Sequence, residues 1–484
     1  MKVISNSILN RYGKKWPFFF LFFSLLKVHS QEIAKVSELV DSIKIYYNSQ
    51  DHSALYRLLS EDFKSKIKES DLTEFYKNNL YQNYGKIISY RYHKNEQGAE
   101  TYQMRMNKGQ LKLVLYIESH LRIAGMQWLP MNDQGEAQQK RRSDYLSDNA
   151  KASPLDLKVD SAVKDHMSSV VSCGLSLGIY KNGKEYYYNY GETKRETKKA
   201  TTKNSIYEIG SITKTFTGIL LAKAVSENKI GLNDDIRLWL PGNYPDLEYK
   251  GKAILVKHLA DHTSRIPSVP LDIEKQKNYD PLNPYKNYNR QMMFEALKNF
   301  KPDTVPGSKY DYSNMGMSLL GIILEKVYGK KYEELIHEFA ANFQLSHTRV
   351  KLAADDSNLL CAGYNDSGKE TPYWDLNEFM AAGGIHSCTE DIIRYLKLNL
   401  EEKEIGMKES HQIHWGDEKF GTGLGWHIIQ TKKGNKMIWH NGGTYGFSSF
   451  CGFIREKDCA LIILSNSGSN VDAIGISLFK FLQE

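Results

Sequence analysis

The apolar positions between residues 32 and 129 change their spacing along the chain. Val36, Leu39, Val40 and Ile43 recur at intervals of three and four, which is the spacing of one face of an α-helix. Further on, apolar and polar residues alternate in two runs, which predicts two antiparallel strands joined at Asn107-Lys108-Gly109. The alternating apolar residues are Tyr102, Met104 and Met106 in the first run and Leu111, Leu113, Leu115 and Ile117 in the second.

Residues 31–130 are therefore predicted to form one small α+β domain. Helices packed on a curved sheet of this size resemble the nuclear-transport-factor-2-like cone fold, in the small version found ahead of secreted hydrolases. We see no convergent group of His, Asp or Glu in this range that would commit it to chemistry. We therefore expect a non-catalytic accessory domain that holds a small ligand or docks to a partner in the cell envelope.

A polar stretch separates this domain from the rest of the chain. Residues 131–153 contain few large apolar side chains, as expected for an exposed linker. The second domain is predicted to span residues 154–484. It opens with apolar and polar residues that alternate on both sides of Asn182-Gly183, a strong hairpin signal.

The rest of the second domain mixes strands and helices in blocks. Segments rich in strand-forming residues occur at 436–438, 447–454 and 460–465, followed by a final helix. Helical patterns dominate between these strands and the first hairpin. This order favours an α+β fold over the regular alternation of an α/β fold.

The first 30 residues have the composition of a secretory signal peptide. Four basic residues precede an apolar run of 11 residues, from Trp16 to Leu26. Because a helix needs about 20 apolar residues to span a bilayer, this run suits a cleaved signal better than a permanent anchor. Val28 and Ser30 are small enough for cleavage after Ser30, although an uncleaved amphipathic anchor stays an alternative. The mature protein is therefore predicted to be periplasmic or extracellular.

Composition and charge narrow the class of protein. At 484 residues the chain is long enough for two folded units, and its 41% hydrophobic and 25% charged residues are ordinary for globular proteins. The net charge of +7 falls to +2 without residues 1–30, which carry five Lys or Arg and no acid (7 − 5 = 2), so nucleic acid is not an expected partner. Five scattered cysteines without a C-x-x-C pair argue against a disulfide framework and a zinc site.

Ser211 and Lys214 form an S-x-x-K motif at the predicted start of an apolar helix. Residues three apart on a helix lie on neighbouring turns, so an amine with its pKa lowered by burial can accept the serine proton. A serine in the first turn also places its own N–H among the unpaired amides of the helix N-terminus, where a developing oxyanion can bind. The pattern recurs at 24–27, 65–68 and 161–164, but only the copy at 211 has a glycine before it and an apolar helix behind it.

Tyr312 and Asn314 form a Y-x-N motif between a predicted turn and another apolar helix. A phenol near a lysine ammonium can ionise more easily and act as a general base, and an amide side chain offers a donor and an acceptor to a substrate amide. Y-x-N is common in this tyrosine-rich chain, since it recurs at 46–48, 76–78 and 285–287. Alone, the motif therefore carries little weight.

A third segment places small residues before a strand, at His440-Asn441-Gly442-Gly443, where backbone can approach a ligand closely. In this order the three motifs resemble the class C β-lactamase and D-alanyl-D-alanine carboxypeptidase superfamily of serine hydrolases. The resemblance covers residues 156–484 and extends to the framing segments 257–264 and 382–387.

The resemblance implies an antiparallel sheet flanked by helices, and it implies site residues. Ser211 would be the nucleophile, Lys214 and Tyr312 the proton-transfer pair, and Asn314 a substrate ligand. Gly443 would complete the oxyanion hole with the N–H of Ser211, and His440 and Gly442 would also border the substrate. No metal or organic cofactor is implied.

Two departures from the family pattern bear on the substrate. His440 stands where β-lactamases carry lysine, and a largely neutral imidazole anchors a substrate carboxylate less well than an ammonium. This makes efficient β-lactam hydrolysis less expected than cleavage of a peptide, such as a D-amino-acid or cell-wall type, or of an ester. The second departure is Arg265, where the family commonly has glycine, with no effect that the sequence predicts.

Two other classes of protein are weaker interpretations. His258 and His262 are four apart and could share a helix face as metal ligands, but position 259 is leucine and not the glutamate of a metalloprotease. A buried, hydrogen-bonded pair explains them better. A non-catalytic binder of cell-wall peptides would keep the pocket, but Ser211, Lys214 and Tyr312 are all present. A β-lactamase stays an alternative within the enzymes.

Overall fold

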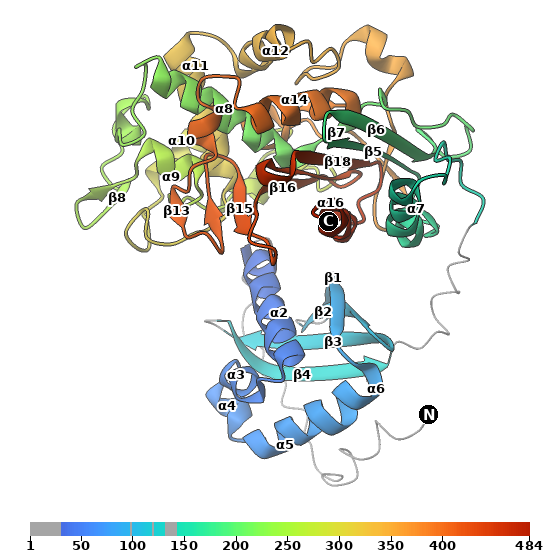
Figure 1. Ribbon diagram of the computed structural model, residues 1–484. Coiled ribbons are helices and arrows are strands. Elements are labelled where there is room, and N and C mark those ends of the chain that lie inside the picture. The colour runs from blue at the N-terminus through green and yellow to red at the C-terminus, as the bar shows by residue number, and fades with distance from the viewer. Residues whose placement is uncertain (1–30, 97–98, 119–120, 131–142) are drawn as a thin grey trace. The chain divides into compact units, whose positions relative to one another are not determined.

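Figure 1 shows the protein as a computed structural model. The structure describes residues 31–96, 99–118, 121–130 and 143–484. The predicted signal peptide at 1–30 and the linker residues 131–142 lie outside the described residues. The chain divides into two compact units between residues 137 and 138, and each is described by itself.

The N-terminal unit packs short helices against a four-stranded antiparallel sheet, in the order β1-β2-β3-β4. Its helical segments are α2 (Gln31–Ser49), α3 (His52–Arg57), α4 (Glu61–Lys64), α5 (Glu69–Glu74), the π-helical segment Phe75–Tyr81 and α6 (Gln82–Tyr84). Its strands are β1 (Ile87–Glu96), β2 (Ala99–Met106), β3 (Gly109–Glu118) and β4 (Arg122–Pro130).

The periodicities read from the sequence hold in this unit. The side chains of Val36, Leu39, Val40 and Ile43 on α2 are buried against the sheet. Met106 pairs with Gly109 across the predicted turn, so β2 and β3 form the expected hairpin. The resemblance to the nuclear-transport-factor-2-like fold and the accessory role stay predictions.

The second unit is built on an eight-stranded antiparallel sheet, which confirms the α+β fold with helices on both faces. The strand order is β13-β14-β15-β16-β17-β18-β5-β6, so the first hairpin lies beside the last strand of the chain. The strands are β5 (Gly174–Lys181), β6 (Lys184–Gly191), β13 (Trp415–Gly416), β14 (Gly421–Thr422), β15 (His427–Gln430), β16 (Lys436–Gly443), β17 (Ser448–Ile454) and β18 (Cys459–Ser465).

Helices cover the two faces of this sheet in separate layers. Two helices, α7 and α16, pack on one face, and α8 and α14 pack with the remaining helices on the other (Figure 1). Alternate residues of β18 enter the two cores, Leu461 and Ile463 on one side and Ile462 and Leu464 on the other. The helices are α7 (Pro154–Met167), α8 (Thr213–Ser226), α9 (Val256–Ala260), α10 (Arg290–Lys298), α11 (Asn314–Tyr328), α12 (Tyr332–Asn342), α13 (Met380–Gly383), α14 (Thr389–Glu401), α15 (Met407–Ser410) and α16 (Asp472–Leu482).

Local turn chemistry explains the first hairpin of this unit. Asn182 and Gly183 have φ angles of 49° and 80°, and Lys181 pairs with Lys184 across them. Positive φ at both central residues matches the right-handed twist of the flanking strands, which is why Asn-Gly is favoured there. The predicted hairpin is therefore confirmed.

Two boundaries differ from the sequence interpretation. The strand expected at 436–438 continues to Gly443 as β16, because residues 437–443 pair with β17 along their whole length. In the predicted linker, Ser147 bridges to Tyr190, and the Asp148 carboxylate accepts hydrogen bonds from the backbone N–H and side-chain amide of Asn189 on β6. This end of the linker is thus attached to the second unit.

All five cysteines are buried. Among the residues that the structure describes, no helix combines the length and the apolar character that crossing a membrane requires.

Candidate active site

Ser211 lies in a 3₁₀ turn, Gly210–Ile212, that runs directly into α8. Gly210 has a φ angle of 52°, and a Cβ atom on it would meet the backbone nitrogen of Gly443 at 2.6 Å. Only glycine therefore allows this turn to lie against β16. Nearly every side chain of α8 is buried, so the turn that carries Ser211 stands on a rigid base.

Lys214 is fully buried beneath Ser211 and has three oxygen neighbours. Its Nζ atom lies 3.0 Å from Ser211 Oγ, 2.7 Å from Asn314 Oδ1 and 2.7 Å from the carbonyl oxygen of Ala382. Burial lowers the pKa of Lys214 well below its usual range, because the low-dielectric interior disfavours the charged amine. In the S-x-x-K motifs at 65–68 and 161–164, the serine and the lysine are both exposed. The motif at 211–214 differs from them because its lysine is buried.

The Y-x-N motif lies against Lys214 and beside Ser211. Ser313 caps α11 by accepting a hydrogen bond from the N–H of Gly316 at 2.8 Å, which places Asn314 at the first position of the helix. Tyr312 precedes this cap, and Lys214 Nζ lies 4.8 Å from the centre of its ring. The phenol also lies near enough to Ser211 for that side chain to act on its pKa. Two segments about 100 residues apart thus meet at Lys214.

The proton affinities of this pair differ from the mechanism read from the sequence. An ammonium at Lys214 was expected to make the phenol of Tyr312 ionise more easily. Burial instead raises the pKa of Tyr312 above its usual range, while burial lowers the pKa of Lys214. Burial thus disfavours the charged form of both groups, because a dry site penalises either charge.

The third motif approaches Ser211 through its backbone. A Cβ atom on Gly442 would lie 2.2 Å from the carbonyl oxygen of Ile209 and 2.9 Å from the backbone nitrogen of Ser211. Gly443 is the next residue and lines the same pocket as Ser211. The absence of side chains at Gly442 and Gly210 lets β16 lie against the turn that holds Ser211.

His440 occupies a different place from the other motif residues. Its ring is 1% exposed, lies 6.2 Å from the ring of Tyr312 and stacks on His427 at 4.7 Å. Burial, with the neighbouring His427 and Lys214, lowers its pKa well below the usual range, so the imidazole is neutral. It packs behind Tyr312 and is not one of the residues that line the pocket.

Two more histidines complete this packing. His262 lies 4.4 Å from the ring of Tyr312, and His427 lies 6.4 Å from it. Ser313 donates its backbone N–H to His262 Nδ1 at 3.2 Å, which connects the histidine to the start of α11. Burial lowers the pKa of both histidines, that of His427 to about 4. Tyr312 therefore lies against three neutral imidazole rings.

His258 and His262 do not share a helix face, which corrects the geometry considered for a metal site. Helix α9 ends at Ala260, and His262 has a φ angle of 63° outside it. His258 Nδ1 accepts the N–H of Leu255 at 3.1 Å, so each of the two histidines is hydrogen-bonded to backbone. Within the described residues no group of three His, Cys, Asp or Glu is arranged to hold a metal ion.

Arg265 connects the segment of His262 to the Y-x-N loop. Its guanidinium donates to both carboxylate oxygens of Asp303, at 2.8 and 3.0 Å, and lies 3.2 Å from Asp311, the residue before Tyr312. Its φ angle of 67° explains why glycine is common at this position in the family. This chain keeps the left-handed backbone and adds a side chain that ties Asp303 to Asp311.

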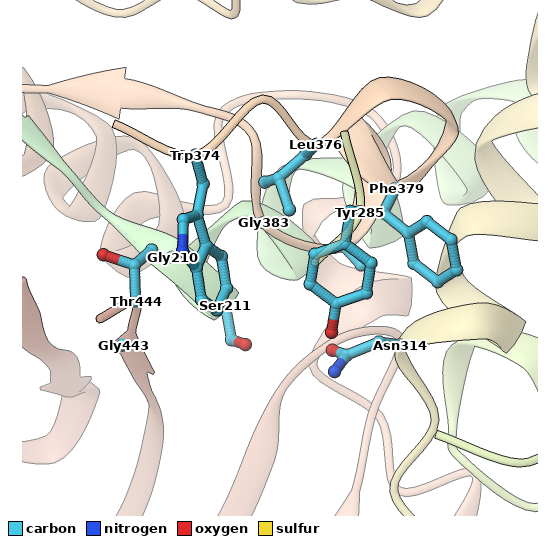
Figure 2. Close-up of a pocket in the computed structure, with 11 residues that line it drawn as sticks. Gly210, Ser211, Tyr285, Asn314, Trp374, Leu376, Phe379, Gly383, Gly443 and Thr444 are labelled. Atoms are coloured by element: carbon cyan, nitrogen blue, oxygen red, sulfur yellow. The ribbon is translucent and has the colours of Figure 1, made fainter. Parts of the chain in front are cut away.

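Ser211, Asn314 and Gly443 open into one pocket, shown in Figure 2. The other residues that line it are Gly210, Tyr285, Trp374, Leu376, Phe379, Ala382, Gly383 and Thr444. The aromatic residues among them were missed in the sequence, where Tyr285 matched only as one more Y-x-N. A loop position with no periodic pattern gives no sign that its side chain faces a pocket.

Glu208 lies behind this pocket, three residues before Ser211, on the short strand β7 (Tyr207–Glu208), which pairs with β12 (His386–Ser387). It accepts the backbone N–H of Trp374 and the hydroxyl of Thr444, both at 2.6 Å. Burial raises the pKa of this carboxyl to about 7, although the two hydrogen bonds oppose the shift. Glu208 thus ties two parts of the pocket wall to the strand before the nucleophile.

The fold and this site together define a serine hydrolase of the penicillin-recognising type. The β-lactamase family profile matches residues 159–480, about two thirds of the chain, and the chain therefore belongs to the β-lactamase family. The resemblance of this part of the chain is confirmed. The match lies within the second unit and does not reach residues 31–130.

Solved structures share the fold of this unit. A β-lactamase/D-alanine carboxypeptidase from Pseudomonas syringae superposes with a TM-score of 0.59 at 22% identity, over 68% of this chain and 99% of that protein. The octameric penicillin-binding protein homologue from Pyrococcus abyssi superposes with a TM-score of 0.59 at 26% identity, over 67% of this chain and 77% of that protein.

Relatives by sequence carry related names. A β-lactamase of Pseudomonas fluorescens is 25% identical over 345 residues, which is 64% of this chain and 92% of the relative. A β-lactamase of Providencia stuartii is 27% identical over 353 residues, or 64% and 86%. The protein flp of Staphylococcus aureus strain N315 is 26% identical over 329 residues, or 64% and 63%.

Proposed function

We propose that the protein cleaves a peptide or ester by acyl transfer to Ser211 and then to water. The observation that carries this proposal is the position of Lys214 Nζ, 3.0 Å from Ser211 Oγ and buried against two further oxygen atoms. A serine hydroxyl is a weak nucleophile unless a base within hydrogen-bond reach removes its proton. Lys214 meets this distance, and burial favours its uncharged form, which can accept the proton.

The three partners of Lys214 indicate which way its hydrogen bonds run. The carbonyl oxygen of Ala382 and Asn314 Oδ1 can only accept, so they take the two N–H groups of a neutral amine. The lone pair of Nζ then faces Ser211 Oγ, whose hydroxyl donates to it. In this arrangement Lys214 takes the proton as Ser211 Oγ forms its bond to the substrate carbonyl carbon.

Tyr312 is suited to the second proton transfer. Its hydroxyl lies near Ser211 and its ring lies beside Lys214, so it can relay the proton from Lys214 to the leaving amine or alcohol. Its raised pKa keeps it a phenol, which is the form that donates a proton. Loss of the leaving group gives the acyl-enzyme at Ser211, and water then attacks with the same groups acting in reverse.

The charge that develops on the carbonyl oxygen needs donors already in place. We assign this role to the backbone N–H groups of Ser211 and Gly443, whose chain segments lie in contact at Gly210 and Gly442. Asn314 lines the pocket beside Ser211, so its amide N–H can donate to the substrate while its oxygen accepts from Lys214. His440 and Gly442 support this site from behind.

A β-lactamase is the second candidate, and the names of the relatives from Pseudomonas fluorescens and Providencia stuartii favour it. The position of His440 argues for peptide or ester cleavage, since a buried neutral imidazole behind Tyr312 offers no cation to a β-lactam carboxylate. We also propose export through residues 1–30, and an accessory, envelope-facing role for residues 31–130.

Intact mass spectrometry of the mature protein tests this proposal. We expect a fluorophosphonate to add one adduct to the wild type and none to the Ser211→Ala variant. A lasting penicilloyl adduct would favour a peptidase, and rapid turnover of penicillins a β-lactamase. If no probe labels the wild type, acyl transfer at Ser211 is wrong and a non-catalytic binder takes its place.

A further inference from the structure

One wall of the Ser211 pocket is aromatic and apolar. Tyr285 packs on Phe379 at a ring distance of 4.5 Å and on Trp374 at 5.6 Å, and Leu376 lines the same pocket. Figure 2 shows Trp374, Tyr285 and Phe379 along one side of the pocket and Ser211 and Asn314 below them. A group bound to the carbonyl that Ser211 attacks therefore has an apolar surface to cover.

The apolar wall continues outward to the surface. The indole N–H of Trp374 donates to the carbonyl oxygen of Leu282 at 3.1 Å, and its ring meets Tyr445 edge to face at 5.0 Å. Leu282 is 51% exposed and Tyr445 is 41% exposed. These exposed side chains extend the apolar surface beyond the pocket, so a chain longer than a short acyl group could lie along it.

Three acidic side chains lie near this wall. The Glu208 carboxyl accepts hydrogen bonds from Trp374 and Thr444. At the outer rim, Asp280 and Glu274 lie close enough to Tyr445 to act on its phenol. A negative charge on the bound group would be repelled by Asp280 and Glu274.

We propose that the group on the acyl side of the scissile bond is an apolar chain or ring without negative charge, bound along Tyr285, Trp374 and Phe379 and out to Leu282. This inference rests on the acyl transfer proposed above and adds the class of substrate to it. It favours esters or amides of apolar carboxylic acids over substrates whose acyl part carries a carboxylate.

A matched set of p-nitrophenyl esters tests the proposal with the mature wild-type protein. Acetate, hexanoate and the adipate monoester share one leaving group, and the last two have acyl chains of equal length that end in methyl or carboxylate. Each buried methylene favours binding by about fourfold, so partial burial of four carbons predicts at least about tenfold higher kcat/KM for hexanoate than for acetate. We expect the adipate monoester to be at least about tenfold below hexanoate.

Two variants test whether the aromatic wall causes the preference for hexanoate over acetate. Trp374→Ala should reduce the hexanoate-to-acetate ratio to within about threefold. Because a buried change can disturb folding, Leu282→Asp at the exposed rim serves as a second variant and should lower the ratio in the same direction. Leu238→Asp is the matched control, since Leu238 is 68% exposed and is not part of the pocket, and it should leave the ratio unchanged.

The outcomes separate this proposal from the one it rests on. Three results would overturn the apolar substrate class: equal kcat/KM for acetate and hexanoate, faster cleavage of the adipate monoester than of hexanoate, or an unchanged hexanoate-to-acetate ratio in both variants. Fluorophosphonate labelling of Ser211 would still support acyl transfer in each of these cases. Failure of both ester cleavage and labelling would overturn acyl transfer itself.

Discussion

The two sides of the active site are held in place by different forces. On the nucleophile side, Lys214 is fixed by three oxygen atoms within 3.0 Å, and Ser211 stands on a buried helix. On the other side, Tyr312 lies against the rings of His262, His427 and His440, at 4.4 to 6.4 Å between ring centres. Hydrogen bonds fix direction, whereas ring packing mainly fixes position.

This difference suits the two proton transfers that we propose. The base must point its lone pair at one hydroxyl, which the two accepting oxygens around Lys214 achieve. The phenol must reach both Ser211 and a leaving group of varying size, so an orientation set by packing leaves its hydroxyl free to rotate. Changes on the nucleophile side are therefore expected to cost more activity than changes on the tyrosine side.

The largest effect is expected from Lys214→Met, which keeps an unbranched side chain out to Cε and removes the amine. We expect kcat to fall at least about 10⁴-fold, because residues that act as one catalytic unit fail together. The measurement is steady-state ester hydrolysis, with circular dichroism to show that the variant is folded. Lys223→Met, on the same helix, is the control. A loss below tenfold would remove Lys214 as the base.

Tyr312→Phe should cost less, about 10² to 10⁴-fold in kcat, the usual contribution of one proton-transfer group. The ring and its packing against the histidines are kept, so the loss reports on the hydroxyl alone. Stopped-flow measurement of the first turnover separates acylation from deacylation. Full activity in this variant would mean that Tyr312 takes no part in proton transfer. The nucleophile side would then carry out the proton transfers without the tyrosine side.

The pH dependence should follow Lys214. The proposed mechanism needs the neutral amine, and burial lowers the pKa of this lysine well below its usual range. The rate therefore falls as pH drops through the lowered pKa and reaches a plateau above it. A profile of kcat/KM from pH 4 to 9 checks this sign. A rate that is still rising above pH 9 would mean that Lys214 is charged in the resting enzyme.

A smaller effect is expected from Arg265→Gly, which restores the residue common in the family. The ion pairs to Asp303 and Asp311 are lost, so the loop of Tyr312 is held less firmly and kcat should fall about tenfold with little change in KM. Arg265→Lys, which keeps one charge, should recover part of this loss. If the glycine variant keeps its kcat, the guanidinium does not position Tyr312.

The smallest effect concerns stability and Glu208. Its pKa is raised from 4.5 to about 7 in the folded protein, so the folded state holds a proton that the unfolded chain has lost. The resulting stabilisation is complete below pH 4.5 and disappears as the pH rises through 7, on the order of 1 to 3 kcal/mol. Glu208→Gln should flatten this part of the curve. Urea unfolding at pH 5 and pH 8 measures the difference between the two proteins.

Patterns along the chain predicted more of the fold than of the pocket. The Asn182-Gly183 hairpin and the helix of Val36 to Ile43 were found because their periodicity is local. Ser211, Lys214 and Tyr312 were predicted from two short motifs and the resemblance, and the structure brings these three side chains together. Trp374 and Tyr285 were not, since they lie on irregular segments that only tertiary packing brings to Ser211. The four-residue spacing of His258 and His262 suggested one helix face. Helix α9 instead ends before His262, whose backbone is left-handed.

The burial of the five cysteines has a consequence for unfolding. Burial raises the pKa of Cys361, Cys388 and Cys451 above the usual range and that of Cys459 to about 11, so these thiols are unreactive while the fold is intact. In the unfolded chain each thiol returns to a pKa of about 8.5 and can cross-link with any other. In an oxidising medium, thermal unfolding should thus become irreversible, and the lifetime of the enzyme would be set by its unfolding rate.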